Sequence, residues 1–140
     1  MAMTLTIIKP DAFAAGNAGN ILAALEREGF AVRAAKVLHL TTAQAQAFYE
    51  VHAARPFYAS LVEFMTSGPC MPVALERDNA VPHLRQVMGA TDPAKADAGT
   101  IRKLYASSIE RNAIHGSDSA ENAANEVAFF FSRCELIAAR

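Results

Sequence analysis

The sequence contains few cysteines. Its 140 residues include only Cys70 and Cys134, which stand far apart and show neither a CxxC pair nor the spacing of metal ligands. Their number and placement argue against a domain built on disulfides and against a cysteine-based metal site, and they favour a reducing compartment such as the cytoplasm. We expect both side chains to be buried free thiols, the common state of isolated cysteines.

The chain also has almost no net charge. Lysine and arginine number 13 and the acidic residues 14, which gives a formal net charge of −1. A chain so nearly neutral has no overall field that would attract nucleic acid or an anionic membrane surface, so we expect no obligatory nucleic-acid partner. Any anionic ligand must instead be bound by a local cluster of basic side chains.

Long apolar runs, repeats and linkers are missing as well. The apolar segment at residues 1–8 is too short for a signal peptide or a membrane span, and Lys9-Pro10-Asp11 ends it. No internal repeat or low-complexity tract divides the chain. We therefore expect residues 1–140 to form a single domain that has no membrane partner and is large enough to bury its own core.

Hydrophobic periodicity predicts alternating strands and helices. We expect strands at residues 4–8, 30–40, 71–76 and 127–131, the last one buried on both faces because its apolar run is unbroken. Helices are expected to begin near Asn17 or Asn20, Thr41 or Thr42, Pro56, Asp78 or Asn79, Thr100 and Asp118. This order predicts an α+β fold of the ferredoxin-like, split βαβ type. We expect a four-stranded antiparallel sheet with helices on one face, an extra helical hairpin and a long loop before His115.

Residues 111–119 contain several side chains that could take part in a chemical reaction. His115 is followed by Gly116, whose missing Cβ lets the backbone pass close to the ring. A neutral imidazole is a nucleophile near pH 7. Asp118 and Glu121 have the spacing of a capping box, so we expect a helix to begin beside His115. The free N–H groups at the start of a helix can bind a phosphate. The alternative is a helix cap that merely follows a histidine.

Other polar and aromatic residues permit two interpretations each. Lys9 lies at the end of a strand, where it binds a ligand or is simply solvated. Tyr49 and His52 share a helix face, either as the edge of the core or as a hydroxyl and an imidazole offered to a phosphorylated ligand. Phe57, in the first turn of a helix, either stacks on a base or packs in the core. Arg85 lies off the apolar stripe of its helix and can face a ligand.

At this point the residues resemble a known family, the nucleoside diphosphate kinases. The similarity runs from Thr4 to Phe131 and rests on separated blocks in one order: residues 8–11, Tyr49 with residues 52–58, 67–69, 88–93, 99–102 and 111–119. The end at Arg140 resembles the shorter bacterial members. The sequence departs from many relatives at Lys103-Leu104 and at Cys70-Met71-Pro72, which puts loop packing and subunit contacts in doubt.

The resemblance implies a ping-pong phosphotransferase with broad base and sugar tolerance. His115 would take the γ-phosphoryl group from a nucleoside triphosphate such as ATP or GTP through Nδ1 and give it to a nucleoside diphosphate. Glu126, aided by Ser117, would orient the imidazole, and Lys9 and Tyr49 would approach the transferred group and the 3′-hydroxyl. The remaining nucleotide contacts would be His52, Arg85, Thr91 and Arg102 for the phosphates, Asn112 for the sugar, and Phe57, Leu61 and Ile109 for the base.

The resemblance also implies a cofactor and an assembly. Mg²⁺ would be bound mainly through the nucleotide phosphates, with Asp118 reaching it through water and no direct protein ligand. The family resemblance favours a homotetramer, with a hexamer or a dimer as alternatives. Two other functions fit the same pattern: a non-catalytic nucleotide-sensing module, and a phosphohistidine relay that receives its phosphate from a donor protein.

Overall fold

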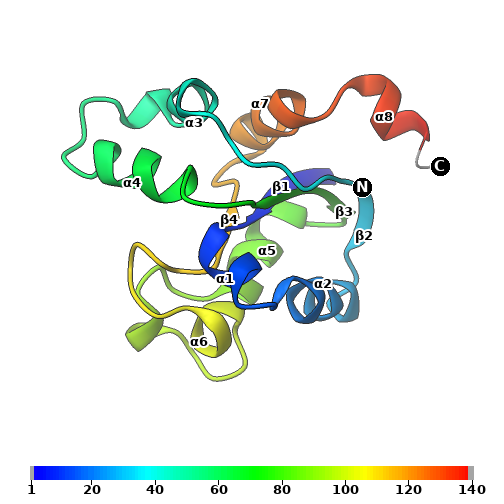
Figure 1. The fold of residues 1–140 in the computed structure, drawn as a ribbon. Coiled ribbons are helices and arrows are strands. Elements are labelled where there is room, and N and C mark those ends of the chain that lie inside the picture. Colours follow the sequence, from blue (N-terminus) through cyan, green and yellow to red (C-terminus); the bar gives the residue numbers. More distant parts are fainter. Residues whose placement is uncertain (1, 139–140) are drawn as a thin grey trace.

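Four strands form one antiparallel sheet in the order β2-β3-β1-β4 (Figure 1). The structure is a computed structural model that describes residues 2–138. The strands are β1 (Ala2–Ile8), β2 (Ala31–Ala35), β3 (Met71–Arg77) and β4 (Ile114–Gly116). In the registers that matter for the site, Ile8 of β1 pairs with Met71 of β3 and Ile7 pairs with His115 of β4. The expected α+β fold with a four-stranded antiparallel sheet is therefore confirmed.

Ten helical segments connect and cover these strands within the described residues. They are α1 (Pro10–Ala14), α2 (Ala18–Arg27), α3 (Thr42–Phe48), η1 (Glu50–His52), α4 (Tyr58–Met65), α5 (Ala80–Met88), η2 (Pro93–Lys95), α6 (Ile101–Tyr105), α7 (Ala120–Phe130) and α8 (Arg133–Ala138), where η marks a 3-10 turn.

The helices cover both faces of the sheet, and the expectation that they cover one face is wrong. Alternation along β1 sends Leu5 and Ile7 to a core cluster shared with α3, α4 and α7, whereas Ile8 belongs to a second cluster shared with α2 and α5. Figure 1 shows α3, α4 and α7 on one side of the sheet and α1, α2, α5 and α6 on the other. This double cover explains why residues 4–8 are all buried.

The fourth strand lies elsewhere than the sequence predicts. Residues 127–131 were expected to be a central strand, but Val127 to Phe130 form the last part of helix α7, and the fourth strand is the three-residue segment β4. A five-residue apolar run has no period that separates strand from helix. Here α7 buries Ala123, Val127 and Phe130, spaced as one helical face requires.

Several smaller expectations also need correction. The predicted strand at residues 30–40 ends at Ala35, after which only an isolated bridge joins Leu38 to Cys70. Cys70 is buried as expected, but Cys134, in α8, is exposed. The expected cap of α7 also moves by one residue. Its N-cap is Ser119, whose hydroxyl accepts from the backbone N–H of Asn122.

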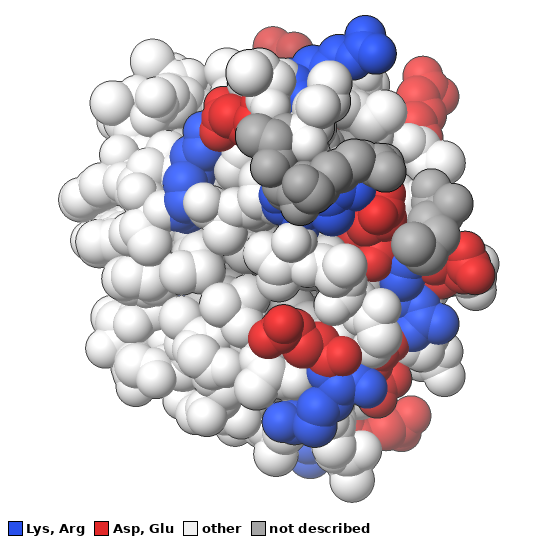
Figure 2. Space-filling view, turned by 90° about the vertical axis from the view of Figure 1, so that its right-hand side faces the viewer, with Lys and Arg blue, Asp and Glu red and all other residues white. Residues whose placement is uncertain are grey.

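The helix termini otherwise follow local chemistry. Thr41 and Gln44 form a reciprocal capping box at the start of α3. Gly89 ends α5 with a φ of +88°, a backbone conformation that favours glycine. No helix in the described part of the chain is long and apolar enough to cross a bilayer. On the face drawn in Figure 2, basic and acidic side chains lie close to one another, in keeping with the balanced composition.

Candidate active site

His115 is positioned by the sheet and by a strained backbone residue before it. β4 pairs with β1 so that His115 lies opposite Ile7, and Thr6 donates a hydrogen bond to the His115 carbonyl at 2.7 Å. Ala113 has a φ of +74°, rare for a residue with a Cβ. Its N–H donates to the Asp11 carboxylate at 3.0 Å and its carbonyl accepts from the Lys9 N–H at 2.9 Å. These hydrogen bonds join residues 9–11 to the segment that carries His115.

One nitrogen of the His115 ring is committed to a carboxylate. Nε2 lies 2.7 Å from Oε1 of Glu126, on α7. An ionised carboxylate only accepts, so Nε2 carries the proton and the lone pair is on Nδ1. The hydroxyl of Ser117 donates to the same oxygen at 2.8 Å and accepts from the Leu5 N–H at 3.3 Å. Glu126 is thereby fixed from two sides, and it fixes the tautomer of the imidazole.

Burial keeps the imidazole neutral. The His115 side chain is 19% exposed, and desolvation lowers its pKa below the ordinary 6.5. The hydrogen bond and charge of Glu126 act in the opposite direction, while Lys9 and Arg102 add a smaller lowering effect. A neutral ring with a free Nδ1 lone pair is the form that a nucleophile requires.

Three basic side chains gather near His115 without carboxylate partners. Arg85 donates to the Gly116 carbonyl at 3.0 Å, Arg102 to the carbonyls of Ile114 at 2.9 Å and Gly89 at 3.2 Å, and Lys9 to the side-chain oxygen of Asn112 at 2.9 Å. None of these three cations takes part in an ion pair within residues 2–138.

The basic side chains perturb one another because they are close and partly desolvated. Burial, followed by the charge of Arg102, lowers the pKa of Lys9 to about 8. Burial and the charge of Arg85 lower the pKa of Arg102 to about 10. Keeping like charges close together and partly buried costs free energy. An anion such as a phosphate offsets this cost when it binds between them.

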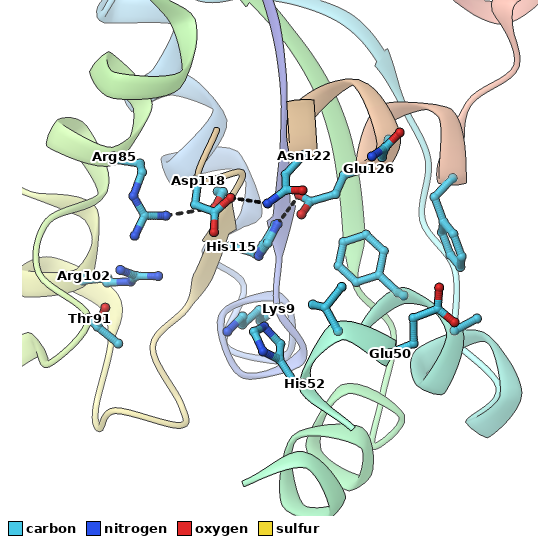
Figure 3. A pocket seen from close by; sticks show the side chains of 16 residues that line it. Lys9, Glu50, His52, Arg85, Thr91, Arg102, His115, Asp118, Asn122 and Glu126 are labelled. Atoms are coloured by element: carbon cyan, nitrogen blue, oxygen red, sulfur yellow. Dashed lines mark hydrogen bonds and ion pairs between the residues drawn. The ribbon is translucent and has the colours of Figure 1, made fainter. Parts of the chain in front are cut away.

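These groups surround a cavity of about 670 Å³ (Figure 3). Figure 3 shows Arg85, Arg102 and Thr91 on one side of His115 and Glu126 on the other. The predicted site residues that line the cavity are Lys9, His52, Arg85, Thr91, Arg102, His115, Asp118 and Glu126. The structure thus brings the predicted nucleophile, its orienting carboxylate and the predicted phosphate contacts to one place.

Other predicted residues lie behind or beside this cavity. Ser117 is fully buried behind Glu126, and Asn112 is 4% exposed, with its amide oxygen holding Lys9. Tyr49 is not on the cavity wall: it is 6% exposed in the core, and its hydroxyl has no hydrogen-bond partner in the described part of the chain. Tyr49 and His52 do not belong to one α-helix, because α3 ends at Phe48 and Tyr49 is the N-cap of the 3-10 turn η1 that contains His52.

The predicted base contacts do not line the cavity. Phe57 is 46% exposed, and its ring centroid lies 5.4 Å from that of His52, on the cavity wall. Ile109 is 61% exposed on the loop before β4, and the hydrogen bond from Ser60 to Glu110 joins this loop to α4. Leu61, on α4, is partly buried against the core. These residues therefore present apolar surface outside the cavity, and Phe57 contacts the cavity wall at His52.

Sequence reasoning missed part of the wall. Phe48, Glu50, Asn122, Asn125 and Phe129 line the cavity. For α7 a signal was available, because Asn122 and Phe129 lie four residues before and three residues after Glu126 and share its helix face. Phe48 had no such signal, since only the fold brings the end of α3 to β4.

Side chains of the kind that bind metal ions are not clustered on the described wall of the cavity. No group of three or more His, Cys, Asp or Glu side chains suitable for a metal occurs in the part of the chain that the structure describes. Asp118 lines the cavity, and its carboxylate accepts from the Asn122 amide at 2.6 Å. One exposed carboxylate near a cluster of basic side chains fits Mg²⁺, which retains its waters and needs few protein ligands.

The chain is similar to proteins of one family over almost its whole length. The family described as "Nucleoside diphosphate kinase" matches residues 2–136. A nucleoside diphosphate kinase of Campylobacter fetus subsp. fetus is 57% identical over 136 residues, covering 97% of this chain and 99% of that protein. One of Chlorobaculum tepidum is 57% identical over 137 residues, 98% of each. The solved Aquifex aeolicus nucleoside diphosphate kinase superposes with a TM-score of 0.94 at 42% identity, covering 96% of this chain and 97% of that one.

Proposed function

Because the chain belongs to the nucleoside diphosphate kinase family, we propose that it transfers a γ-phosphoryl group from a nucleoside triphosphate to a nucleoside diphosphate through His115. The observation that carries this proposal is a neutral imidazole next to three basic side chains that form no ion pair among residues 2–138. The His115 ring is held at Nε2 by Glu126 in a cavity whose wall includes Lys9, Arg85 and Arg102.

In the first half-reaction, Nδ1 of His115 attacks the γ-phosphorus. The N–P bond forms while the bond to the β–γ bridging oxygen breaks, and the diphosphate leaves with that oxygen's electrons. The ring gains positive charge as its lone pair is shared, and the Glu126 carboxylate at Nε2 stabilises this charge. In the second half-reaction, a β-phosphate oxygen of the incoming diphosphate attacks the phosphorus and the N–P bond breaks.

The basic side chains bind the phosphates and stabilise the transferred charge. Arg85 and Arg102 offer planar guanidinium groups suited to two oxygens at once. Lys9 approaches the transferred group and the 3′-hydroxyl. Asn112, whose amide oxygen accepts from the Lys9 ammonium group at 2.9 Å, binds the sugar. Thr91 and His52 complete the phosphate contacts on the cavity wall. Tyr49, as the resemblance implied, is the second group proposed to approach the transferred group, and its buried hydroxyl has no hydrogen-bond partner among residues 2–138.

The base is held by faces and not by hydrogen bonds to its edges. Phe57 and Ile109, with Leu61 beside the first, supply exposed or partly exposed apolar surface outside the cavity. None of these side chains can read a donor and acceptor pattern, so bases are accepted broadly. When bound through the nucleotide phosphates, Mg²⁺ would neutralise phosphate charge, and Asp118, on the cavity wall, would hold it through water.

We also propose a domain organisation, a compartment and an oligomeric state for the enzyme. Residues 1–140 act as one domain, since both core clusters share a single sheet. Two free cysteines suit the reducing cytoplasm. The family resemblance favours a homotetramer, with a hexamer or a dimer as alternatives. The edge strand β2, where Val32 is 39% exposed, offers one surface to a second copy. Sedimentation at several protein concentrations measures the assembly.

Labelling with γ-³²P ATP and Mg²⁺ tests the phosphoryl transfer. We expect an acid-labile, alkali-stable label on His115 that added diphosphate removes as a labelled triphosphate. His115→Ala should bind nucleotide and carry no label. Nucleotide binding to the wild-type chain without any covalent label would overturn the proposal in favour of a sensing module. Labelling that occurs only with a phosphorylated donor protein would overturn it in favour of a relay.

A further inference from the structure

Phe48 is the aromatic neighbour of the proposed nucleophile. It ends helix α3 and lines the cavity, and its ring centroid lies 5.5 Å from that of the His115 imidazole at an interplanar angle of 76°. Among the ring contacts of residues 2–138, this is the one that reaches His115. A near-perpendicular pair at this distance is a favourable aromatic geometry.

The contact with Glu126 leaves one motion of the imidazole free. That hydrogen bond fixes Nε2, and the chain fixes Cβ, but these two points lie at opposite ends of the side chain. The ring can still rock about the line that joins them, because the χ2 torsion of histidine has broad wells. Rocking moves Nδ1 through an arc while Nε2 keeps its hydrogen bond, so Glu126 alone does not aim the attacking lone pair.

Phe48 is itself held by other rings. Its centroid lies 4.8 Å from that of Tyr49 at 89°, 5.3 Å from that of Phe129 at 66° and 5.1 Å from that of Phe130 at 48°. Tyr49 and Phe130 are buried in the core that α3 shares with α7. Phe48 therefore transmits the rigidity of this core to one side of the imidazole.

We propose that Phe48 is a positioning residue that blocks the rocking of the His115 ring and so aims Nδ1 at the γ-phosphorus. The inference rests on the proposed role of His115 as nucleophile. Phe48 touches neither phosphate nor base in this scheme and acts on the reaction through the imidazole. An attacking atom displaced by about 1 Å can cost on the order of 100-fold in rate, so loss of the ring should be visible in the chemical step.

Three variants separate this role from general support of the core. Phe48→Leu removes the ring and keeps apolar bulk, and Phe48→Tyr keeps the ring. Phe131→Leu makes the same change at a buried residue of the same core cluster, and no ring pair among residues 2–138 joins Phe131 to Phe48 or His115. Each variant is assayed for single-turnover phosphorylation by labelled ATP, for the Kd of ADP and for thermal unfolding.

We expect Phe48→Leu to phosphorylate at least about 10-fold more slowly at saturating ATP, with the Kd of ADP changed less than about twofold. Phe48→Tyr should restore most of the rate. Phe131→Leu should melt at a lower temperature and keep the wild-type rate. The inference is overturned if Phe48→Leu reacts at the wild-type rate, if both leucine variants lose rate equally, or if the loss in Phe48→Leu lies in nucleotide affinity. Absence of label on the wild-type enzyme would instead refute the function of His115.

Discussion

Oε1 of Glu126 lies 2.7 Å from Nε2 of His115, although the two residues are separated by 11 positions and belong to a helix and a strand. The contact depends on β4 ending at Gly116 and α7 beginning at Ala120, so that the first turns of the helix return over the strand. Ser117, between them, donates to the same oxygen and secures the carboxylate. The hydrogen bond that fixes the tautomer of the proposed nucleophile thus depends on a single short connection.

Replacing Glu126 by glutamine should slow phosphorylation of His115 by about 10- to 100-fold. The amide can still accept from Nε2, but it removes the negative charge that stabilises the ring as the N–P bond forms, and a hydrogen bond to a charged group contributes roughly 1.5–3 kcal/mol. Single-turnover labelling measures the rate. Glu121→Gln, an exposed change on the first turn of the same helix, is the matched control and should react normally. A Glu126→Gln protein that no longer folds would assign Glu126 a structural role.

The acid limb of the activity should lie below pH 6.5. Burial lowers the pKa of His115 from this ordinary value, so the ring stays neutral until the pH falls further. Since Glu126 is one of the groups that raise this pKa, its replacement by glutamine should shift the acid limb of kcat/KM to still lower pH. An acid limb that moves upward in the variant would contradict the assignment of that limb to His115.

The same titration affects stability with a defined sign. The pKa of His115 is lower in the folded chain than in the unfolded chain, so the unfolded chain binds the proton more readily. The contribution of His115 to the free energy of unfolding is therefore present above about pH 6.5 and lost as the pH falls below it. In urea titrations, His115→Ala should have a smaller loss of stability than the wild type between pH 6.5 and 5. An equal loss in both proteins would exclude this source.

Lys9 should produce an alkaline limb near pH 8. Burial, aided by the charge of Arg102, lowers its pKa to about 8, and the neutral amine no longer binds phosphate as a cation. We expect kcat/KM, which reports the free enzyme, to fall as the pH rises through this value. In Lys9→Met the activity should be lower throughout and this limb should be absent. Lys103→Met, an exposed change, should keep the limb. Its persistence in Lys9→Met would assign it to another group.

Much of the fold can be predicted from the sequence where a period is long enough to read. Residues 71–76 were expected as a strand and form most of β3, and Gly89 ends α5 as expected. The three-residue β4 is too short to show alternation, so the apolar run at residues 127–131 took its place in the prediction. The short helix α1, which begins at Pro10, was not expected because residues 10–14 carry no helical stripe of useful length.

Some residues of the site could be predicted from the sequence, and others could not. Lys9, Arg85, Arg102 and His115 could be named because their residue types and blocks resemble one family, and the structure gathers them around one cavity. Phe48 could not, since its role depends on the packing of α3 against α7 and not on its own neighbours in the chain. The same limitation applies to Tyr49, whose burial depends on the packing of α3 and not on its spacing from His52.

Replacing Phe57 by alanine should weaken the binding of every nucleoside diphosphate by a similar factor. The ring is 46% exposed, so the change should not unfold the chain, and loss of base stacking costs roughly 1–3 kcal/mol, about 5- to 150-fold in Kd. Titration calorimetry with ADP, GDP, CDP and UDP measures the effect. Leu104→Ala, which removes another exposed apolar side chain, should leave the four affinities unchanged. A loss confined to purines would contradict recognition by faces.

Gly116 should tolerate a methyl group only if Met88 is shortened. A Cβ on Gly116 would lie 2.5 Å from Sδ of Met88 and 3.2 Å from Cδ2 of Leu84, both fully buried, so Gly116→Ala should destabilise the chain by about 1–3 kcal/mol. Met88→Ala should cost about 2–5 kcal/mol through its cavity. Because the new methyl group occupies part of that cavity, the double variant should cost less than the sum.

Urea unfolding of the four proteins in this cycle measures the coupling between Gly116 and Met88. Gly19→Ala is the matched control, since a Cβ there meets nothing within 4 Å and the residue lies inside α2. It should leave the stability unchanged or raise it by at most about 0.5 kcal/mol, because alanine is favoured over glycine in a helix and Gly19 lies in its first turn. If the losses in free energy of unfolding at Gly116 and Met88 simply add, the two residues do not interact. In that case β4 shifts to relieve the contact with α5, and His115 moves with it.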